Sequence, residues 1–239
     1  MAIAFVQAAQ PTGTGSGATT LAKAFTSNNT AGNFLFVTAN IHITAGTGTL
    51  TVSDSLGNTY TQAPNSPVTQ SPEQSYVWYV PSCLSGANTV TVTATGTVAG
   101  YIQLGILEYS GVATSNPVDT YGSNSAGAGA TITASTIGST TNANDLVLLM
   151  MTSTNGGIGL PTGYTNRCGN DSYFKVDELI TTSTGVQSIS TSQNSSVWTA
   201  QIIAFLPPSS GRSRTSSRSL TSIRTLTTTR SLTSLRSLT

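Results

Sequence analysis

Short segments rich in Val, Ile, Thr, Tyr and Phe alternate with Gly, Asn, Ser and Pro along residues 1–206. β-branched and aromatic residues favour extended chain, and the intervening residues favour turns. No segment shows a sustained 3.6-residue apolar period with helix caps, so we expect very little helix. The clearest predicted strands are residues 33–43, 49–53, 75–80, 89–95, 101–109, 145–152, 173–180 and 197–206.

Many short strands joined by explicit turns predict an all-β fold, which we expect to be a jelly-roll-like sandwich of two sheets. A single sandwich domain is expected over residues 1–206, because this length can bury one large core. The predicted core includes Leu35, Val37, Val147 and Ile203.

The predicted strands recur in a similar order in two halves of the chain. A duplication and a chance likeness between β-rich segments are both open as explanations. Because neither half, at about 80 and 65 residues, is long enough to bury two sheet faces comfortably alone, we expect both to supply hairpins to one sandwich. The matched segments are 31–37 with 143–148, 75–80 with 172–176, 89–95 with 186–192, and 101–109 with 197–206.

Four motifs support a family resemblance: SDSLGNTY at residues 53–60, GANTVTV at 86–92, LEYSG at 107–111 and TNANDL at 141–146. Over residues 30–206 they resemble a β-sandwich module that recurs in large surface and secreted proteins of environmental bacteria. Similar modules occur in phage structural proteins. The resemblance implies the fold and a role in display, adhesion or carbohydrate contact.

The expected surface is polar but almost uncharged. Only 7% of the residues are charged, whereas a typical soluble domain has roughly 25%. Ser and Thr number 76 of 239 residues. Residues 1–211 hold three basic and eight acidic residues, a net charge of −5, whereas residues 212–239 hold six Arg and no acid, a net charge of +6. This composition suits an extracellular or particle-bound protein.

A linker at residues 207–211, with sequence PPSSG, separates the sandwich from a tail at residues 212–239. Pro207 and Pro208 cannot donate ladder hydrogen bonds, so the last strand must end before them. In the tail, Arg and Leu each recur every six residues. An apolar residue at every third position drifts by about 60° per step around an α-helix, so an extended tail is expected.

An extended tail of this pattern presents apolar side chains on both faces, which one strand cannot bury. We therefore expect copies of the tail to pack together, as a trimer or higher homo-oligomer, and to pair with the acidic body of a neighbouring subunit. A disordered basic linker is the alternative. Nucleic-acid binding is not expected, because the tail has no aromatic residue for base stacking. The predicted assembly residues are Arg218, Leu220, Ile223, Arg224, Leu226, Arg230, Leu232, Leu235, Arg236 and Leu238.

We expect no catalytic residue. The one histidine, His42, would have to be the base of any Ser-His-Asp triad, and no GxSxG motif is present. Strand alternation instead places His42 on the sheet face opposite Leu35 and Val37. Glu108 lies in an apolar strand, where we expect a structural carboxylate held by backbone or hydroxyl donors, although a raised pKa is conceivable there.

No metal or cofactor is expected. Asp54 with Asn58, and a loose group of Asp171, Asp177 and Glu178, could bind Ca²⁺ weakly, but neither has the spacing of a dedicated loop. Cys83 and Cys168 could form a disulfide, although two buried thiols are favoured. Trp78 and Trp198 are expected in the core. The aromatic residues that could stack on sugars are Tyr76, Trp78, Tyr79, Tyr101, Tyr109, Tyr121 and Trp198.

Residues 1–10 lack the basic and apolar regions of a signal peptide, and no apolar run reaches the roughly 18–20 residues of a membrane span. We therefore expect a non-enzymatic structural virion protein of a bacteriophage, a capsid decoration or fibre subunit on the virion surface. Its expected partners are copies of itself, other virion proteins and a host-surface glycan, with no membrane. The alternatives are a carbohydrate-binding or adhesive module of a bacterial surface, and a glycan-cleaving enzyme, which would need two carboxylates about 5–10 Å apart.

Overall fold

A computed structural model divides the chain into a unit of residues 1–209 and a unit of residues 210–239. The structure describes residues 2–13, 17–169 and 173–209, so the predicted tail and all of its assembly residues, from Arg218 to Leu238, lie outside the described residues. The described residues form strands and no helix, which confirms the all-β prediction. It follows that they contain no helix long and apolar enough to cross a membrane.

Fourteen strands make up the described part of the chain. The strands are β1 (Ala4–Gly13), β2 (Thr20–Ala24), β3 (Phe34–Asp54), β4 (Thr61–Gln62), β5 (Val68–Gln70), β6 (Glu73–Val80), β7 (Thr89–Ser110), β8 (Val118–Ala126), β9 (Thr131–Ser135), β10 (Leu146–Ser153), β11 (Thr165–Cys168), β12 (Phe174–Ile180), β13 (Ser188–Ser192) and β14 (Trp198–Phe205).

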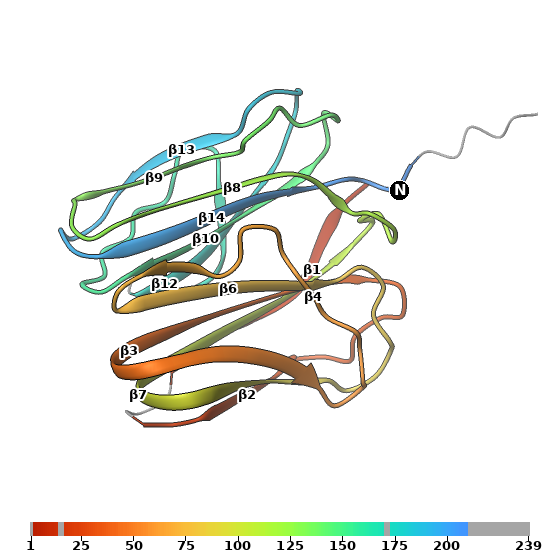
Figure 1. Cartoon of the computed structure of the whole chain (residues 1–239). Coiled ribbons are helices and arrows are strands. Elements are labelled where there is room, and N and C mark those ends of the chain that lie inside the picture. Colours follow the sequence, from red (N-terminus) through yellow and green to blue (C-terminus); the bar gives the residue numbers. More distant parts are fainter. Residues whose placement is uncertain (1, 14–16, 170–172, 210–239) are drawn as a thin grey trace, which may run out of the picture. The chain divides into compact units, whose positions relative to one another are not determined.

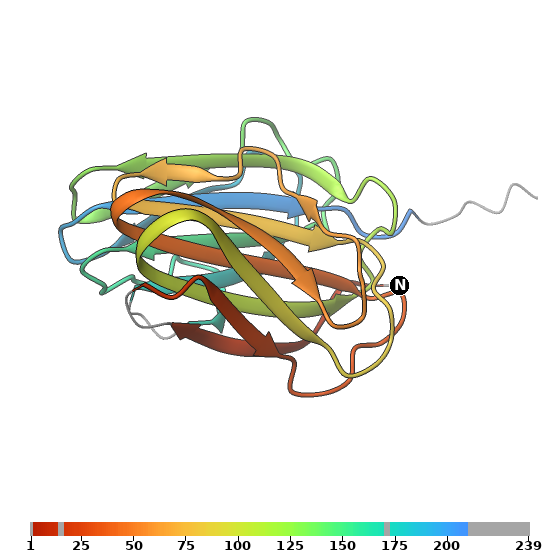
Figure 2. The ribbon, with the colours of Figure 1, turned by 60° about the horizontal axis from the view of Figure 1, so that its bottom comes forward.

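Two pairs of predicted strands are each one long strand in the structure. Residues 33–43 and 49–53 join in β3, and residues 89–95 and 101–109 join in β7. The joining follows from pairing, because β3 and β7 are antiparallel partners along nearly their whole lengths. Figure 2 shows the two strands, in orange and yellow-green, curling together beyond the rest of the sheet.

The strands form three antiparallel sheets, whereas the sequence predicts two. One sheet has the order β1-β7-β3-β6-β4, with β2 on β7 and β5 on β6; the second has the order β11-β12-β10-β14-β8; the third pairs β13 with β9. The sheets stack in layers, with β9 and β13 at one end and β2 beside the curled part of β3 and β7 at the other (Figure 1).

The strand pairings show that the two halves of residues 1–206 have corresponding strand orders. We name residues 4–110 the N-terminal repeat and residues 118–205 the C-terminal repeat. The order β1-β7-β3-β6-β4 in the first repeat corresponds to β8-β14-β10-β12-β11 in the second. The pairing of β2 with the first part of β7 corresponds to the pairing of β9 with β13.

Each repeat buries its own core, and a third core lies between the repeats. Leu35, Val37 and Trp78 belong to the core of the N-terminal repeat, and Val147 and Trp198 belong to the core of the C-terminal repeat. The third core joins the two five-stranded faces and includes Phe34, Phe36, Leu146, Leu148 and Ile203. The predicted core residues are confirmed as buried, but they lie in three clusters where the sequence predicts one core.

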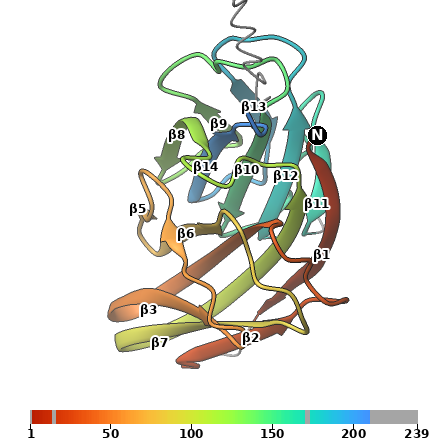
Figure 3. The same ribbon diagram turned by 90° about the vertical axis from the view of Figure 1, so that its right-hand side faces the viewer.

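The inter-repeat core is apolar at one end and polar at the other. Along β3, the side chains that face the second repeat change from Phe34 and Phe36 to Thr38 and Asn40, and then His42. Along β10, the equivalent positions change from Leu146, Leu148 and Met150 to Thr152, and then to Thr154 just beyond the strand end. At the edge of this interface β1 and β11 lie side by side (Figure 3), and the Arg167 guanidinium lies 4.2 Å from the centroid of the Phe5 ring.

Candidate functional site

A cavity of about 430 Å³ lies at the polar end of the inter-repeat interface. Strands β1, β3, β6 and β7 line it from the N-terminal repeat. The end of β10 with the residue after it, and the residue before β12, line it from the C-terminal repeat. The lining residues are Gly13, Asn40, His42, Glu73, Tyr101, Gln103, Ser153, Thr154 and Tyr173.

A buried carboxylate, that of Glu73, anchors the cavity. Glu73 is only 2% exposed. It accepts a hydrogen bond from the Asn40 side-chain amide, and its Oε1 lies 2.6 Å from His42 Nδ1. Burial raises the pKa of Glu73, and the hydrogen bonds from His42 and Asn40 oppose the rise. The two bonds hold the carboxylate in place while leaving it in contact with the cavity.

The pairing of β3 with β6 brings these groups together. His42 lies directly opposite Glu73, and Asn40 lies opposite Ser75, two residues along on the same face. On the other side of β3, His42 pairs with Tyr101, and the two ring centroids are 6.2 Å apart. His42 is thus the sheet-face residue that the sequence predicts, and it is also fixed by a buried acid.

Gly100 allows the close approach that positions this part of β3. A Cβ atom on residue 100 would lie 1.7 Å from the carbonyl oxygen of His42. The β3–β7 pairing is irregular at the same place, between Ile43 and Ala45. A side chain at residue 100 would therefore displace the backbone that carries His42.

Asn40 leaves one polar atom without a partner. Its Nδ2 donates to Glu73, whereas its buried Oδ1 has no hydrogen-bond partner among the described residues. The residue is 2% exposed and lines the cavity. A buried acceptor of this kind is costly unless it is satisfied by a further donor, so the site favours a ligand that brings one.

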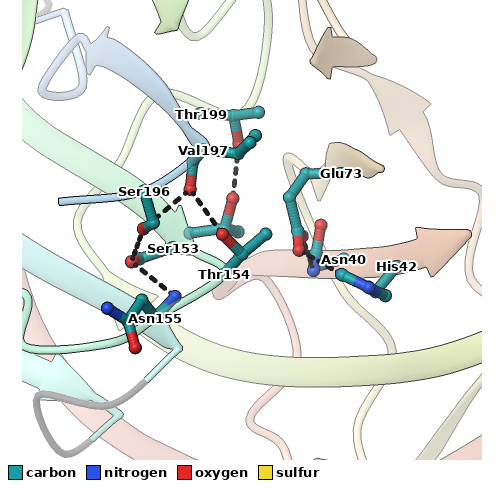
Figure 4. A network of polar contacts seen from close by, with 10 residues as sticks. Asn40, His42, Glu73, Ser153, Thr154, Asn155, Ser196, Val197 and Thr199 are labelled. Carbon is teal, nitrogen blue, oxygen red and sulfur yellow. Dashed lines mark hydrogen bonds and ion pairs between the residues drawn. The ribbon is translucent and has the colours of Figure 1, made fainter. Parts of the chain in front are cut away.

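Hydroxyl groups of the C-terminal repeat form the opposite side. Ser153 Oγ lies 3.1 Å from Ser196 Oγ, and Thr154 Oγ1 donates to the Val197 carbonyl. Deeper in the interface, Thr199 donates to Ser75, which connects the two repeats. Figure 4 shows this hydroxyl-rich group and, separate from it, the Asn40, His42 and Glu73 group.

Two half-exposed tyrosines border the cavity. Tyr101 is 48% exposed and Tyr173 is 51% exposed. Of the aromatic residues proposed from the sequence as sugar-stacking candidates, Tyr76, Trp78, Tyr79, Tyr109 and Trp198 are buried. The core interpretation of Trp78 and Trp198 is therefore confirmed, and Tyr101 is the candidate that lines this cavity.

The described residues that line the cavity include one carboxylate and one histidine. Glu73 is the one carboxylate among its lining residues, so a glycosidase pair is not present there in the described part of the chain. The Ser153 hydroxyl bonds to the Gly156 carbonyl, the Ser196 hydroxyl and the Asn155 backbone N–H, and no described serine or threonine hydroxyl bonds to the His42 ring. The arrangement is suited to holding a polar molecule.

Glu108, the other candidate from the sequence, is a structural carboxylate in the N-terminal repeat. It is fully buried and accepts bonds from Gln7 at 2.6 Å, Asn29 at 2.7 Å and Asn33 at 2.6 Å. It also accepts the backbone N–H of Thr30 at 2.9 Å. The sequence predicts backbone or hydroxyl donors, and the donors in the structure are side-chain amides and one backbone N–H. These bonds connect β1 and the segment before β3 to β7.

Asp54 is likewise saturated by protein donors. Its carboxylate accepts the side-chain amides of Asn58 and Asn88, the Tyr60 hydroxyl, and the backbone N–H groups of Leu56 and Asn58. Burial acts to raise the pKa of Asp54, but these bonds together hold it below its usual value. The carboxylate therefore organises the turn after β3, and its oxygens are occupied.

The second acidic group is not assembled as a site. Asp171 lies outside the described residues, Asp177 Oδ2 lies 3.9 Å from the buried Lys175 Nζ, and Glu178 pairs with Arg167. Among the described residues no three His, Cys, Asp or Glu side chains are grouped so that they could hold a metal ion.

Cys83 and Cys168 are free, buried thiols, which confirms the favoured interpretation. They belong to different cores, Cys83 to that of the N-terminal repeat and Cys168 to the inter-repeat core. Burial raises the pKa of Cys83 to about 11 and that of Cys168 to about 12, so both are protonated at neutral pH.

That Asn40, Glu73 and Tyr173 meet at one site was not predicted from the sequence. Asn40 could have been found, because it shares a strand face with His42 at a spacing of two residues. Glu73 and Tyr173 reach the cavity only through long-range pairing and through the packing of the two repeats, for which the sequence carries no local signal.

No protein-family model, no curated protein and no solved structure matches this chain.

Proposed function

We propose that this chain is a non-enzymatic structural protein displayed on the surface of a bacteriophage particle, as a capsid decoration or fibre subunit. In this proposal the two repeats are a display platform and residues 212–239 mediate assembly. The proposal rests on a contrast between two parts of the chain. In the body, the carboxylates of Glu108 and Asp54 accept hydrogen bonds from structural donors. In the tail, Arg and Leu recur with a regular six-residue spacing. The low content of charged residues adds support.

The strand order supports a jelly-roll-like interpretation of each repeat. In both repeats the first strand lies beside the last, and the last lies beside the third. This arrangement is compatible with the two-sheet jelly rolls of viral and lectin domains. A repeat of this kind offers loops and sheet edges for display without requiring catalytic groups.

Assembly through the tail is tested in the full-length chain. Replacement of Leu220, Leu226, Leu232 and Leu238 by Ser removes the apolar positions and keeps the six arginines. A fully buried Leu contributes roughly 1.5–3 kcal/mol, so this variant should be monomeric where the unchanged chain is a trimer or larger. Light scattering after gel filtration measures the mass.

The matched control changes Thr221, Thr227 and Thr233 to Ser, at positions of the same six-residue spacing. This control should assemble like the unchanged chain. A monomeric unchanged chain, or a leucine variant that assembles normally, would refute the role of the tail. Antibodies against residues 1–209 should label intact particles in electron micrographs, and absence of labelling would count against the virion location.

A carbohydrate-binding or adhesive module is the second candidate. The observation that favours it is the cavity between the repeats, where half-exposed Tyr101 and Tyr173 accompany buried polar groups. Binding of a glycan by the body and assembly by the tail are compatible in one display protein.

A further inference from the structure

We propose that the cavity between the repeats binds one uncharged sugar residue of a surface glycan, with Asn40, His42 and Glu73 contacting its hydroxyls. The inference rests on the proposed display function, and it names the site and the chemical class of the ligand. The cavity volume of about 430 Å³ falls within the roughly 300–1,000 Å³ of typical small-molecule pockets.

The polar groups of the cavity match a polyhydroxyl ligand. Asn40 Oδ1 is a buried acceptor without a described partner, so a ligand hydroxyl that donates to it removes an existing cost. The Glu73 carboxylate has acceptor capacity beyond the bonds from Asn40 and His42. Because His42 uses Nδ1 toward Glu73, its Nε2 is the ring nitrogen left for a ligand.

The tyrosines supply the apolar contact that sugar recognition also needs. Tyr101 and Tyr173 come from different repeats, and about half of each residue is exposed. An aromatic ring with an exposed face can cover the C–H groups of a sugar ring, while its hydroxyl stays in water. The pairing of His42 with Tyr101 on adjacent strands places polar and apolar contacts next to each other.

Charge selects against acidic ligands. Among the described residues that line the cavity there is no Lys or Arg, and Glu73 is the one acidic group. A phosphate, sulfate or carboxylate would therefore meet a buried acid with no described Lys or Arg beside it. An organic cation is the rival ligand that the acid and the two tyrosine rings would also accommodate.

The site is formed by both repeats and is supported from behind. Thr199 of the C-terminal repeat donates to Ser75 of the N-terminal repeat at 2.8 Å, and Gln201 donates to the Ser75 carbonyl at 2.9 Å. These buried bonds hold β14 against β6, the strand that carries Glu73. The cavity is thus preorganised, which lowers the entropic cost of binding.

Saturation-transfer NMR on the full-length chain provides the test. The probes are glucose, galactose, mannose and N-acetylglucosamine, with sialyllactose and tetramethylammonium as acidic and cationic probes. At least one uncharged sugar should bind, and Tyr101→Ala or Tyr173→Ala should weaken its binding at least tenfold. Tyr101→Phe, which keeps the ring, should bind within threefold of the unchanged chain. Glu73→Gln should weaken binding at least tenfold.

The control variant is Ile137→Ala, which truncates an exposed side chain that does not line the cavity. It should bind like the unchanged chain. Absence of binding by every uncharged sugar, binding unaffected by both tyrosine substitutions, or binding only of sialyllactose or tetramethylammonium would overturn the inference. The oligomer mass of the same samples separates the two proposals. A chain that assembles but binds no sugar refutes the cavity proposal alone, and a chain that binds sugar but does not assemble refutes the tail proposal alone.

Discussion

The two repeats share one strand order but stabilise it with different chemistry. In the N-terminal repeat, Leu35 pairs with Val80 and Glu108, and in the C-terminal repeat Val147 pairs with Leu179 and Ala204. Glu108 and Ala204 therefore occupy equivalent positions. A carboxylate with four amide donors in one repeat corresponds to a methyl group in the other.

Two residues before Leu35 and Val147, the amide and the acid are exchanged between the repeats. Asn33, just before β3, donates to Glu108, whereas its equivalent Asp145, just before β10, is a buried acid beside Asp119. Glu108 lies next to the beginning of β3, and Asp145 lies just before β10, so both acids are at the corresponding edge of their sheets. Only in the N-terminal repeat is the acid surrounded by hydrogen-bond donors. The same topology thus tolerates opposite placements of a buried charge, and the donors around it decide its effect on stability.

The outer layers differ as well. In the N-terminal repeat the continuous strands β3 and β7 extend past the five-stranded sheet and form an outer layer with β2. In the C-terminal repeat β10 ends at Ser153, and β13 and β14 are separate strands. The outer layer there is the two-stranded sheet of β9 and β13 alone. The outer layer of the N-terminal repeat is therefore larger because β3 and β7 continue into it, and not because the strand order differs.

Truncation of the buried carboxylate should have the largest effect. Glu108→Ala makes the N-terminal repeat resemble the C-terminal one at this position but leaves the amides of Gln7, Asn29 and Asn33 without their acceptor. We expect the free energy of unfolding to fall by about 4 kcal/mol. Urea denaturation, followed by fluorescence, measures the change.

Each repeat contains one tryptophan, so the effect can be assigned to a repeat. Trp198→Phe leaves Trp78 as the reporter of the N-terminal repeat, and Trp78→Phe leaves Trp198 for the C-terminal repeat. Glu108→Gln keeps one acceptor oxygen and should cost about half as much. A loss below about 1 kcal/mol in Glu108→Ala would show that the four donors find water at little cost.

Local sequence patterns predicted the central strands β3, β6, β7, β10, β12 and β14 and one buried face of each, but they did not single out β1, β2, β4, β5, β8, β9 or β11. Alternation placed Leu35 and Val37 in a core, and the similarity of segments such as 75–80 and 172–176 indicated the corresponding strand orders of the two repeats. The burial of the opposite face was not predictable, because Phe34 and Phe36 are covered by the other repeat.

The candidate site depended on contacts that the sequence does not express locally. His42 was recognised as a sheet-face residue, but its partner Glu73 lies 31 residues away and meets it only in the β3–β6 register. Tyr173 comes from the other repeat. Because the strands are nearly uncharged, their sequence pattern is compatible with many pairing registers. The packing of both sheet faces selects one of these registers.

The continuity of β3 and β7 should depend on Gly100. In Gly100→Ala the new Cβ would meet the His42 carbonyl oxygen at 1.7 Å, so the paired backbones must separate. We expect a loss of about 3 kcal/mol in the free energy of unfolding, because the strain is on backbone rather than on a flexible side chain. Urea denaturation monitored at Trp78 checks this value.

Gly138→Ala in the C-terminal repeat is the matched control, since its nearest contact would be the Thr120 hydroxyl at 3.6 Å. It should change stability by less than about 0.5 kcal/mol. Equal effects of the two substitutions would contradict the assignment of Gly100 to a close approach of the strands.

The smallest expected effect is a gain in stability, and it concerns the acid that lacks the donors of Glu108. Burial, and then the neighbouring Asp119, raise the pKa of Asp145 from 3.8 to about 7. The folded chain therefore retains a proton that the unfolded chain has lost, so stability falls as the pH rises from about 4 to about 7 and stays low above that range. Asp145→Asn imitates the protonated acid and should remove this fall, with a gain of about 2 kcal/mol at pH 8 and little change at pH 4.

Asp54→Asn is the opposite control. The pKa of Asp54 is lowered in the folded chain, so the stabilisation by its carboxylate is present above the pKa of the unfolded chain and is lost as the pH falls. That variant should lose stability at pH 8 and keep the fall between pH 4 and 7. Urea midpoints at several pH values measure both slopes, and an unchanged slope in Asp145→Asn would show that the proton belongs to another group.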